Sequence, residues 1–412
     1  MNEDVFINAI YRLGREFQGS AETLLTRFFA VLLAHDVPLD WAHASFSPKH
    51  PQLKRTVLHW TPQRSSVWGQ PSVPVGLTRG PSRGRSPVKQ LESGLAKTIR
   101  VRLTDKRQRG RFVLTDELAD AGHSEFFGLT IDTGFGSPAM LCFSTMSPIG
   151  FVDEEIEQII LGCQRLEPFF QKEMWASLAK ILSTTYLGRD AGARVLDGHI
   201  SRGDVSKQQA VVWFSDLRDS SRLATELPDT QFIGELNCFF EIVGHCVESR
   251  GGHILKFIGD AVLALFPIIA DVPEQAYQSA VDGAIDCLER LEQLNKVRIK
   301  EGKRALRTGI GLHAGSVSYG NIGTPSRLDF TAVGSTVNIA SRIESLCKAH
   351  QAFFLASESV AKNCGRPLHR LGLFELDGHS DMIELYGLPP EVKFEASRAP
   401  GIIPPVLMDE GH

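Results

Sequence analysis

Two aspartates at the ends of apolar segments could together bind divalent metal ions. Asp216 follows a near-continuous apolar run at residues 211–214, the pattern of a strand that is buried on both faces. Asp260 follows Gly259 at the tip of a predicted hairpin. Carboxylates at two adjacent strand ends can bridge a pair of Mg²⁺ ions, which clamp the attacking and leaving oxygens of an in-line phosphoryl displacement. Taken singly, each has a plainer interpretation, Asp216 as a helix cap and Asp260 as a residue of a Gly-Asp turn.

A helix further along the chain carries an amide and a guanidinium. Residues 306–312 alternate apolar and small side chains as a strand does, and residues 329–334 lead into a predicted helix over 335–349. Asn338 and Arg342 lie four residues apart on that helix, so the two side chains stack on one face. Groups so placed could orient a ribose and neutralise a pentavalent phosphate in a transition state. The alternative is a solvated pair on a surface helix.

The elements that position these residues belong to a chain of ordinary globular composition. It has 412 residues, of which 42% are hydrophobic, so two or three folded units are expected. A net charge of −4 does not favour a nucleic acid or an anionic membrane as partner. No apolar run approaches the roughly 20 residues that span a bilayer, and the acidic residues 1–4 are unlike a signal peptide. Seven cysteines without CxxC spacing indicate reduced thiols, so a cytoplasmic location is expected.

Residues 1–165 have the pattern of a mixed α/β domain. Apolar residues at helical spacing run through 21–34, a strand is expected at 41–46, and short apolar runs follow at 126–144. Residues 61–90 are rich in Pro, Gly, Ser and Arg, which predicts a long mobile loop. This order of elements, closed by a helix, resembles a GAF-type sensory domain. Its histidines could include a haem or metal ligand but are more simply surface or core residues: His35, His43, His50, His59 and His123.

A helical linker is expected over residues 166–205. Four of its apolar residues are spaced by 4, 4 and 3, which suits a two-helix seam between two chains, although packing against their own domain is an equal alternative. They are Phe170, Met174, Leu178 and Ile181. Pro168 is expected to kink or break the helix near its start. Residues 391–412 are rich in proline and are expected to form a flexible tail.

Three motifs that contain the candidate residues follow one another in a fixed order. They read FSDL at residues 214–217, KFIGD at 256–260 and TAVGSTVNIASR at 331–342. In this order and spacing they closely resemble the class III nucleotidyl cyclase domain, which would cover residues 206–390. The resemblance implies an α+β fold with a ferredoxin-like βαββαβ sheet, preceded by the α/β GAF-like domain and the helical linker.

The resemblance also implies a role for each motif residue. Asp216 and Asp260 would bind two Mg²⁺ ions, or Mn²⁺ in their place, together with the carbonyl of Leu217. Asn338 would orient the ribose, and Arg342 would stabilise the transition state. The implied reaction converts ATP to cyclic AMP and pyrophosphate. In this family two chains form a homodimer with two symmetric interfacial sites, each taking its metal ligands from one chain and its other groups from the partner.

The base-reading residues implied by the motifs are Lys256 and Thr331. A lysine ammonium donates to the N1 acceptor of adenine, whereas guanine carries an N1–H donor there. Phe214 and Gly259 complete the implied substrate-binding residues. Thr331 replaces the aspartate of most adenylate cyclases in the family, as in its b subclass, which implies bicarbonate as a regulator. The resemblance of the N-terminal region to a GAF-type domain implies instead an unidentified small molecule.

Two positions depart from the animal enzymes of this family. Ser316 stands in place of a triphosphate-contacting arginine, and Asp377 in place of a phosphate-binding lysine. Another basic group, or the metal ions and a helix N-terminus, would then neutralise the triphosphate.

Two other functions compete with the cyclase hypothesis. One is a catalytically weak or inactive cyclase-like dimer that binds nucleotide for signalling, and the presence of both metal aspartates, Asn338 and Arg342 disfavours it. The other is a diguanylate cyclase, which would need a Gly-Gly-acid-acid-aromatic turn. The hairpin at residues 258–262 reads IGDAV and lacks that turn.

Overall fold

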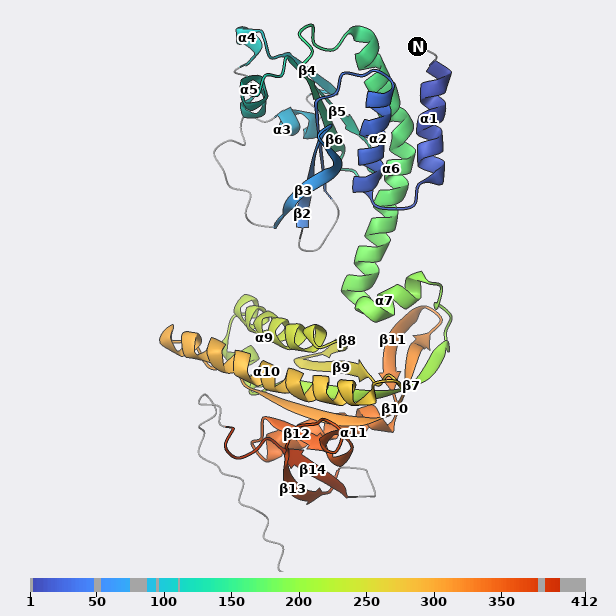
Figure 1. The fold of residues 1–412 in the computed structure, drawn as a ribbon. Helices are drawn as coiled ribbons and strands as arrows, with labels where there is room; N and C mark the ends of the chain where they lie inside the picture. Colours follow the sequence, from blue (N-terminus) through green and yellow to red (C-terminus); the bar gives the residue numbers. More distant parts are fainter. Residues whose placement is uncertain are drawn as a thin grey trace, which may run out of the picture. The chain divides into compact units, whose positions relative to one another are not determined.

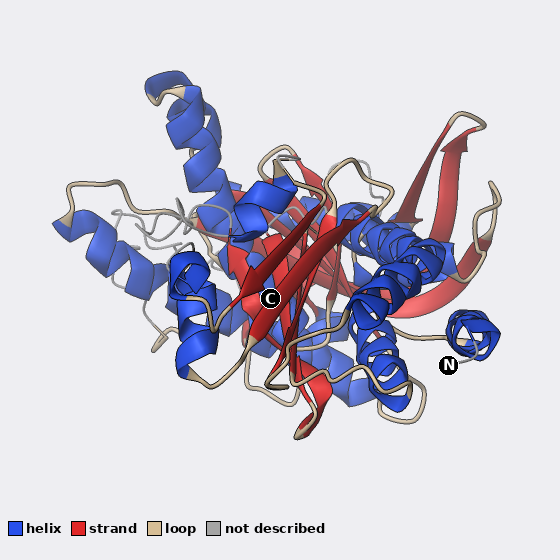
Figure 2. Ribbon diagram, turned by 90° about the horizontal axis from the view of Figure 1, so that it is seen from above, coloured by secondary structure: helices blue, strands red, loops and turns tan. Residues whose placement is uncertain are grey.

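The computed structural model describes residues 3–47, 53–74, 87–93, 96–109, 112–376 and 382–392. The chain divides into two compact units, Met1–Leu182 and Ser183–His412. Figure 1 shows the elements of each unit in chain order, and Figure 2 shows helices flanking the strands. No described helix contains an apolar stretch long enough to cross a membrane. Most of the expected C-terminal tail, residues 393–412, lies outside the described residues.

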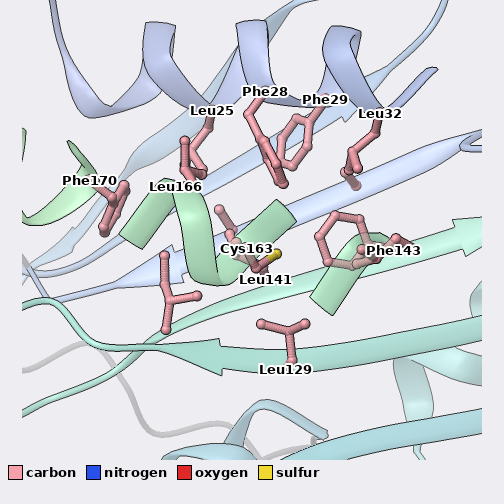
Figure 3. Packing of buried hydrophobic residues seen from close by; sticks show 14 of the residues in the cluster. Leu25, Phe28, Phe29, Leu32, Leu129, Leu141, Phe143, Cys163, Leu166 and Phe170 are labelled. Atoms are coloured by element: carbon pink, nitrogen blue, oxygen red, sulfur yellow. The ribbon is translucent and has the colours of Figure 1, made fainter. Parts of the chain in front are cut away.

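The N-terminal unit is built on a six-stranded antiparallel sheet with the order β3-β2-β1-β6-β5-β4. Its strands are β1 (Trp41–Phe46), β2 (Leu53–Thr61), β3 (Arg64–Pro74), β4 (Thr98–Arg102), β5 (Glu125–Ile131) and β6 (Ala139–Thr145). Its helices are α1 (Glu3–Glu16), α2 (Ala21–Ala34), α3 (Pro87–Glu92), α4 (Lys106–Arg109), α5 (Val113–Asp120) and α6 (Asp153–Leu187). The main core of this unit lies where α2 and α6 pack against the sheet (Figure 3).

The predicted mobile loop over residues 61–90 is wrong for much of its length. Residues 64–74 form β3, which pairs with β2, and α3 begins at Pro87. The composition was misleading because β3 is an edge strand, where the unpaired side tolerates the prolines and glycine that a central strand would exclude. Residues 75–86 lie outside the described part.

The helix α6 runs without a break for 35 residues and contains Pro168. Of the kink or break expected at Pro168, the break is therefore wrong; the packing of buried residues on both sides of the proline supports the helix. Phe170 and Met174 are among these buried residues, so they pack in their own unit and are not available for a seam between chains. Further along α6 the exposed apolar side chains are Trp175, Leu182 and Tyr186.

The C-terminal unit has the mixed α+β composition expected from the sequence. Its sheet has the order β13-β14-β12-β10-β7-β9-β8, and β11 pairs with β10. The strands are β7 (Val205–Leu217), β8 (His253–Ile258), β9 (Ala261–Pro267), β10 (Thr308–Thr324), β11 (Arg327–Val333), β12 (Phe354–Ser357), β13 (His369–Phe374) and β14 (Ile383–Gly387). The helices are α7 (Arg189–Leu196), α8 (Ser220–Glu226), α9 (Asp229–Ser249), α10 (Pro273–Lys300), α11 (Ser335–Ala349) and α12 (Glu358–Ala361).

Alternate residues of β7 face different helices. Val211 and Trp213 belong to the core cluster that contains residues of α9 and α10, whereas Ala210 and Val212 belong to a second cluster with Ala340 of α11. Because side chains alternate along a strand, Asp216 lies on the same side of β7 as Ala210 and Val212. The sheet therefore presents Asp216 on the face that α11 covers.

Two glycines of β10 allow α11 to pack directly on the sheet. A Cβ atom added to Gly311 would lie 2.5 Å from the backbone nitrogen of Glu344 and 2.7 Å from the carbonyl oxygen of Ala340. Gly309 lies two residues earlier on the same face, and a Cβ atom added to it would clash with the side chains of Arg218 and Glu344. Backbone thus contacts backbone, which fixes the distance between α11 and β10.

We predict that Gly311→Ala destabilises the protein by roughly 1–3 kcal/mol, because the added methyl group forces α11 away from β10. Gly234→Ala is the matched control: Gly234 is exposed on α9, and nothing lies within 4 Å of its added Cβ. This control should stabilise the helix by about 0.5–1 kcal/mol. Calorimetric unfolding of the full chain measures both changes. Equal stability of the two variants would contradict the close packing of α11.

Candidate active site

The two candidate metal-binding aspartates lie at one edge of the C-terminal sheet. Asp216 pairs with Ala261 on one side and with Gly309 on the other, and the Thr308 hydroxyl donates to its backbone carbonyl at 2.8 Å. Asp260 occupies the two-residue turn that joins β8 to β9. The turn begins at Gly259, whose φ of 64° is left-handed and unstrained for glycine. The hairpin therefore places Asp260 next to the end of β7.

The carboxyl of Asp216 is poorly solvated and lies beside other acids. Burial, followed by the neighbouring Asp260 and Glu344 carboxyls, raises the pKa of Asp216 to about 7. Its Oδ1 atom is buried and has no hydrogen-bond partner in the described part of the chain. An unpartnered carboxylate oxygen next to a second carboxylate is stabilised by a cation in contact with both.

The oxygen atoms at this edge fit a hard divalent cation such as Mg²⁺. They are the carboxylates of Asp216 and Asp260, with the carbonyl of Leu217 next in the chain. Among the described residues no cluster of three or more His, Cys, Asp or Glu side chains could hold a metal ion. Mg²⁺ commonly takes one or two protein carboxylates and completes its shell with phosphate oxygens and water.

The base-reading candidates lie at a second place in the unit. Lys256 on β8 forms an ion pair with Asp329 on β11, and both border a cavity of about 610 Å³. Thr331 is nearly buried and lies two residues beyond Asp329, on the same side of β11. Sequence reasoning missed Asp329, although its period-2 relation to Thr331 could have indicated it.

The remaining candidates are distributed over α11 and the sheet. Asn338 is exposed and Arg342 half-buried, one turn apart as predicted. Within the described part of the chain, neither side chain makes a hydrogen bond or ion pair with Asp216 or Asp260. Phe214 is half-buried against the cluster that contains Ala340 of α11. A single chain thus has a carboxylate edge at Asp216 and Asp260, the candidate metal-binding edge, and separately an amide and guanidinium face at Asn338 and Arg342.

At Ser316 and Asp377 the sequence departs from the animal enzymes of the family. Ser316 lies on β10, and its carbonyl oxygen accepts a hydrogen bond of 2.7 Å from the Thr336 hydroxyl. This bond ties the first turn of α11 to the sheet. Asp377 lies outside the described residues.

Known proteins resemble the C-terminal unit. Residues 204–386 match the family model described as the adenylate and guanylate cyclase catalytic domain. An adenylate cyclase of Anabaena cylindrica is 32% identical over 173 residues, which are 41% of this chain and 33% of that protein. Adenylate cyclase 1 of Rhizobium meliloti is 29% identical over 195 residues, which are 46% of this chain and 29% of that protein. The chain therefore spans about a third of the length of these curated relatives.

Among solved structures, the adenylyl cyclase CyaB from P. aeruginosa is 25% identical with a TM-score of 0.42, covering 46% of this chain and 98% of that chain. The family match includes all three sequence motifs and the elements that carry them, from β7 to α11. Residues 204–386 of this chain therefore form a domain of the class III adenylate and guanylate cyclase family.

Proposed function

We propose that this chain is an adenylate cyclase that forms 3′,5′-cyclic AMP and pyrophosphate from ATP. The observation that carries the proposal is the adjacency of the Asp216 and Asp260 carboxyls at the end of a buried strand, within a cyclase domain. The relatives from Anabaena cylindrica and Rhizobium meliloti, both named adenylate cyclases, support the choice of ATP.

In the proposed reaction the ribose 3′-oxygen attacks the α-phosphorus of ATP in line with the bond to the β-phosphate. The O3′–P bond forms, the bond from the α-phosphorus to the bridging oxygen breaks, pyrophosphate leaves, and the 3′-hydroxyl proton passes to solvent. Two Mg²⁺ ions, or Mn²⁺ ions, held by Asp216, Asp260 and the Leu217 carbonyl would supply positive charge at the phosphate oxygens. Asn338 would hold the ribose, and Arg342 would donate to the α-phosphate oxygens.

The choice of adenine is inferred from Lys256. Its ammonium borders the cavity and lies beside the Asp329 carboxylate. A charged ammonium can donate only, so it suits the N1 acceptor of adenine. Thr331, nearly buried beyond Asp329, would contact the same base edge.

A second copy of the chain would complete the site. Among the described residues, Asn338 and Arg342 make no hydrogen bond or ion pair with the carboxylates of Asp216 and Asp260. Apolar side chains stay exposed nearby in the fold, on β8 and β11: Phe257, Ile258, Leu328 and Val333. Exposed apolar groups of this kind suit burial against a second copy. A homodimer would then have two isologous sites, each combining the metal-binding edge of one chain with α11 of the other.

The two sheets and the cysteines support further proposals about the fold type, the regulation and the location of this chain. Along the chain the central elements follow one another as β7–α9–β8–β9–α10–β10, and in the sheet their strands lie in the order β10-β7-β9-β8. This connectivity and strand order support a ferredoxin-like βαββαβ core. The six-stranded antiparallel sheet of the N-terminal unit supports a GAF-like regulatory domain, with bicarbonate or an unidentified small molecule as its regulator. Seven free cysteines support a reducing, cytoplasmic location.

A weak or inactive cyclase-like module that binds nucleotide for signalling is the second candidate. Ser316, in place of a triphosphate-contacting arginine, is the observation that favours it. The two candidates differ in turnover, since the module would bind ATP without releasing pyrophosphate.

We expect Asp216→Asn and Asp260→Asn each to lower cyclic AMP formation by about 10³-fold or more, because each removes a carboxylate charge from the metal-binding edge. Asp271→Asn, an exposed acid on the loop after β9, is the control and should keep full activity. Mn²⁺ binding measured by electron paramagnetic resonance should weaken in the two site variants and stay unchanged in the Asp271→Asn control. Activity within tenfold of wild type in both site variants would contradict the metal assignment.

The pair Lys256→Glu and Thr331→Cys tests the base. The combined variant should depress ATP turnover by about 10²-fold or more, because a buried polar group facing adenine loses its partner. GTP turnover should rise slightly. Lys300→Glu, an exposed charge reversal at the end of α10, is the control. If Lys256→Glu alone leaves ATP kinetics unchanged, Lys256 does not read the purine.

Mixing two inactive variants tests the shared site. Asp216→Ala removes a metal ligand from both sites of its homodimer, and Arg342→Ala removes the guanidinium from both. In a hybrid dimer one site collects both defects and the other is wholly native, so random pairing should restore roughly a quarter of wild-type activity. Co-expression with two affinity tags ensures exchange of chains. Purified hybrids without activity would mean that the site lies within one chain.

A further inference from the structure

A buried ion pair lies between the metal-binding edge and α11. Arg218 directly follows Leu217 at the end of β7, and Glu344 lies two residues after Arg342 on α11. Arg218 Nη2 is 3.2 Å from Glu344 Oε1, and the two side chains are only 14% and 6% exposed. Salt in the solvent screens a pair this deeply buried only weakly.

The backbone fixes both ends of this pair. The Arg218 N–H donates to the Arg307 carbonyl at 2.8 Å, which holds the residue after β7 against the start of β10. At the other end, Glu344 lies on the stretch of α11 that packs on Gly311. Gly309 is the cross-strand neighbour of Asp216, and the charged groups of the pair occupy the place where its side chain would lie.

The pair is held by charge more than by hydrogen bonds. Both terminal nitrogens of Arg218 and Glu344 Oε1 are buried and have no hydrogen-bond partner of good geometry in the described part of the chain. A buried ion pair of this kind adds little net stability over apolar replacements, because the desolvation of two charges offsets their attraction. Stability alone therefore does not explain why two charges lie here.

We propose that Arg218 and Glu344 are positioning residues that hold the end of β7 and the Asn338–Arg342 face of α11 in one arrangement. The inference rests on the proposed function, in which the β7 end of a chain serves one site of the dimer and its α11 serves the other. The ion pair in each chain therefore links the two sites. Neither residue needs to touch ATP for this role.

Glu344→Gln keeps the shape of the side chain and leaves Arg218 without its countercharge. In the full-length homodimer it should lower kcat about tenfold and change KM for ATP less than threefold, because every group that contacts ATP remains. The double variant Arg218→Met with Glu344→Met leaves no unpaired charge; it should retain the melting temperature within a few degrees and still show the lower kcat. A kcat within twofold of wild type in both variants would overturn the proposal.

The pair of Arg298 and Glu235 supplies a matched control. It is also buried, at 9% and 18% exposure and 2.6 Å, but it joins α10 to α9 on the other face of the sheet. Arg298→Met with Glu235→Met should change the melting temperature at least as much as the site variant and leave kcat unchanged. Equal losses of kcat in the two double variants would show a general effect of lost ion pairs and would overturn the positioning role.

A dimer with a single intact site tests the link between sites. If one chain carries Asp216→Ala, the remaining site uses the metal-binding edge of the other chain and α11 of the Asp216→Ala chain. Glu344→Gln should lower kcat of that site several-fold when it is placed in either chain, since the ion pair of each chain positions both the end of β7 and α11 of that chain. An effect from only one of the two chains would overturn the link.

Metal binding separates failure of this inference from failure of the proposed function. If wild-type protein forms no cyclic AMP, the proposed function fails, and Mn²⁺ binding to the full chain still tests the pair. Glu344→Gln should then weaken Mn²⁺ binding about fivefold, measured by electron paramagnetic resonance. An unchanged Mn²⁺ affinity would overturn the positioning role.

Discussion

At Gly311 the backbone of α11 lies directly on the backbone of β10, and the arrangement of the candidate site depends on this contact. A side chain at Gly311 would enter the space of Ala340 and Glu344, and one at Gly309 would displace the ion pair of Arg218 with Glu344. Phosphoryl chemistry tolerates little displacement of the groups that surround the phosphate, since misplacement by about 1 Å can cost two orders of magnitude in rate. The absence of a side chain at Gly309 and at Gly311 thus determines where Arg342 of α11 lies.

The same region concentrates charges that a protein core normally excludes. Asp216, Asp260 and Glu344 influence one another, and their repulsion adds to the cost of their partial burial. Arg218 offsets part of this cost, and a divalent cation would offset more. Local arrangements that reduce stability without an evident structural gain are expected at functional sites. The unpartnered oxygen of Asp216 is the clearest example in this chain.

Strongly periodic segments were predictable from the sequence, and relations between distant segments were not. Residues 21–34, 41–46 and 335–349 form α2, β1 and α11 as expected. In the two helices, apolar spacing of about 3.6 residues directly reflects which face is buried. The sequence also predicted the hairpin that carries Asp260. In contrast, β3 was missed because pairing at a sheet edge requires no apolar pattern, and its composition resembles that of a loop.

The site was predictable in its motif residues and not in the residues that hold them. Asp329 lies 73 residues from Lys256, and only the approach of β11 to β8 brings the two together. Glu344 is separated from Arg218 by most of the domain, and its role depends on the absence of a side chain at Gly309. Tertiary packing creates such pairs, so no local pattern marks them.

The ion pair of Lys256 and Asp329 presents one donor and one acceptor to any base in the adjoining cavity. On its Watson–Crick edge adenine offers an amino donor beside the N1 acceptor, whereas guanine offers a carbonyl acceptor beside an N1–H donor. With the ammonium at N1, as proposed, adenine accepts there and its amino group donates to the carboxylate, whereas guanine would place its N1–H donor against the ammonium. The orientation of the ion pair along the base edge then selects the purine. A base fits when its acceptor lies toward the ammonium and its donor lies toward the carboxylate. In the proposed site, Thr331, two residues beyond Asp329 on the strand, would help to fix that orientation.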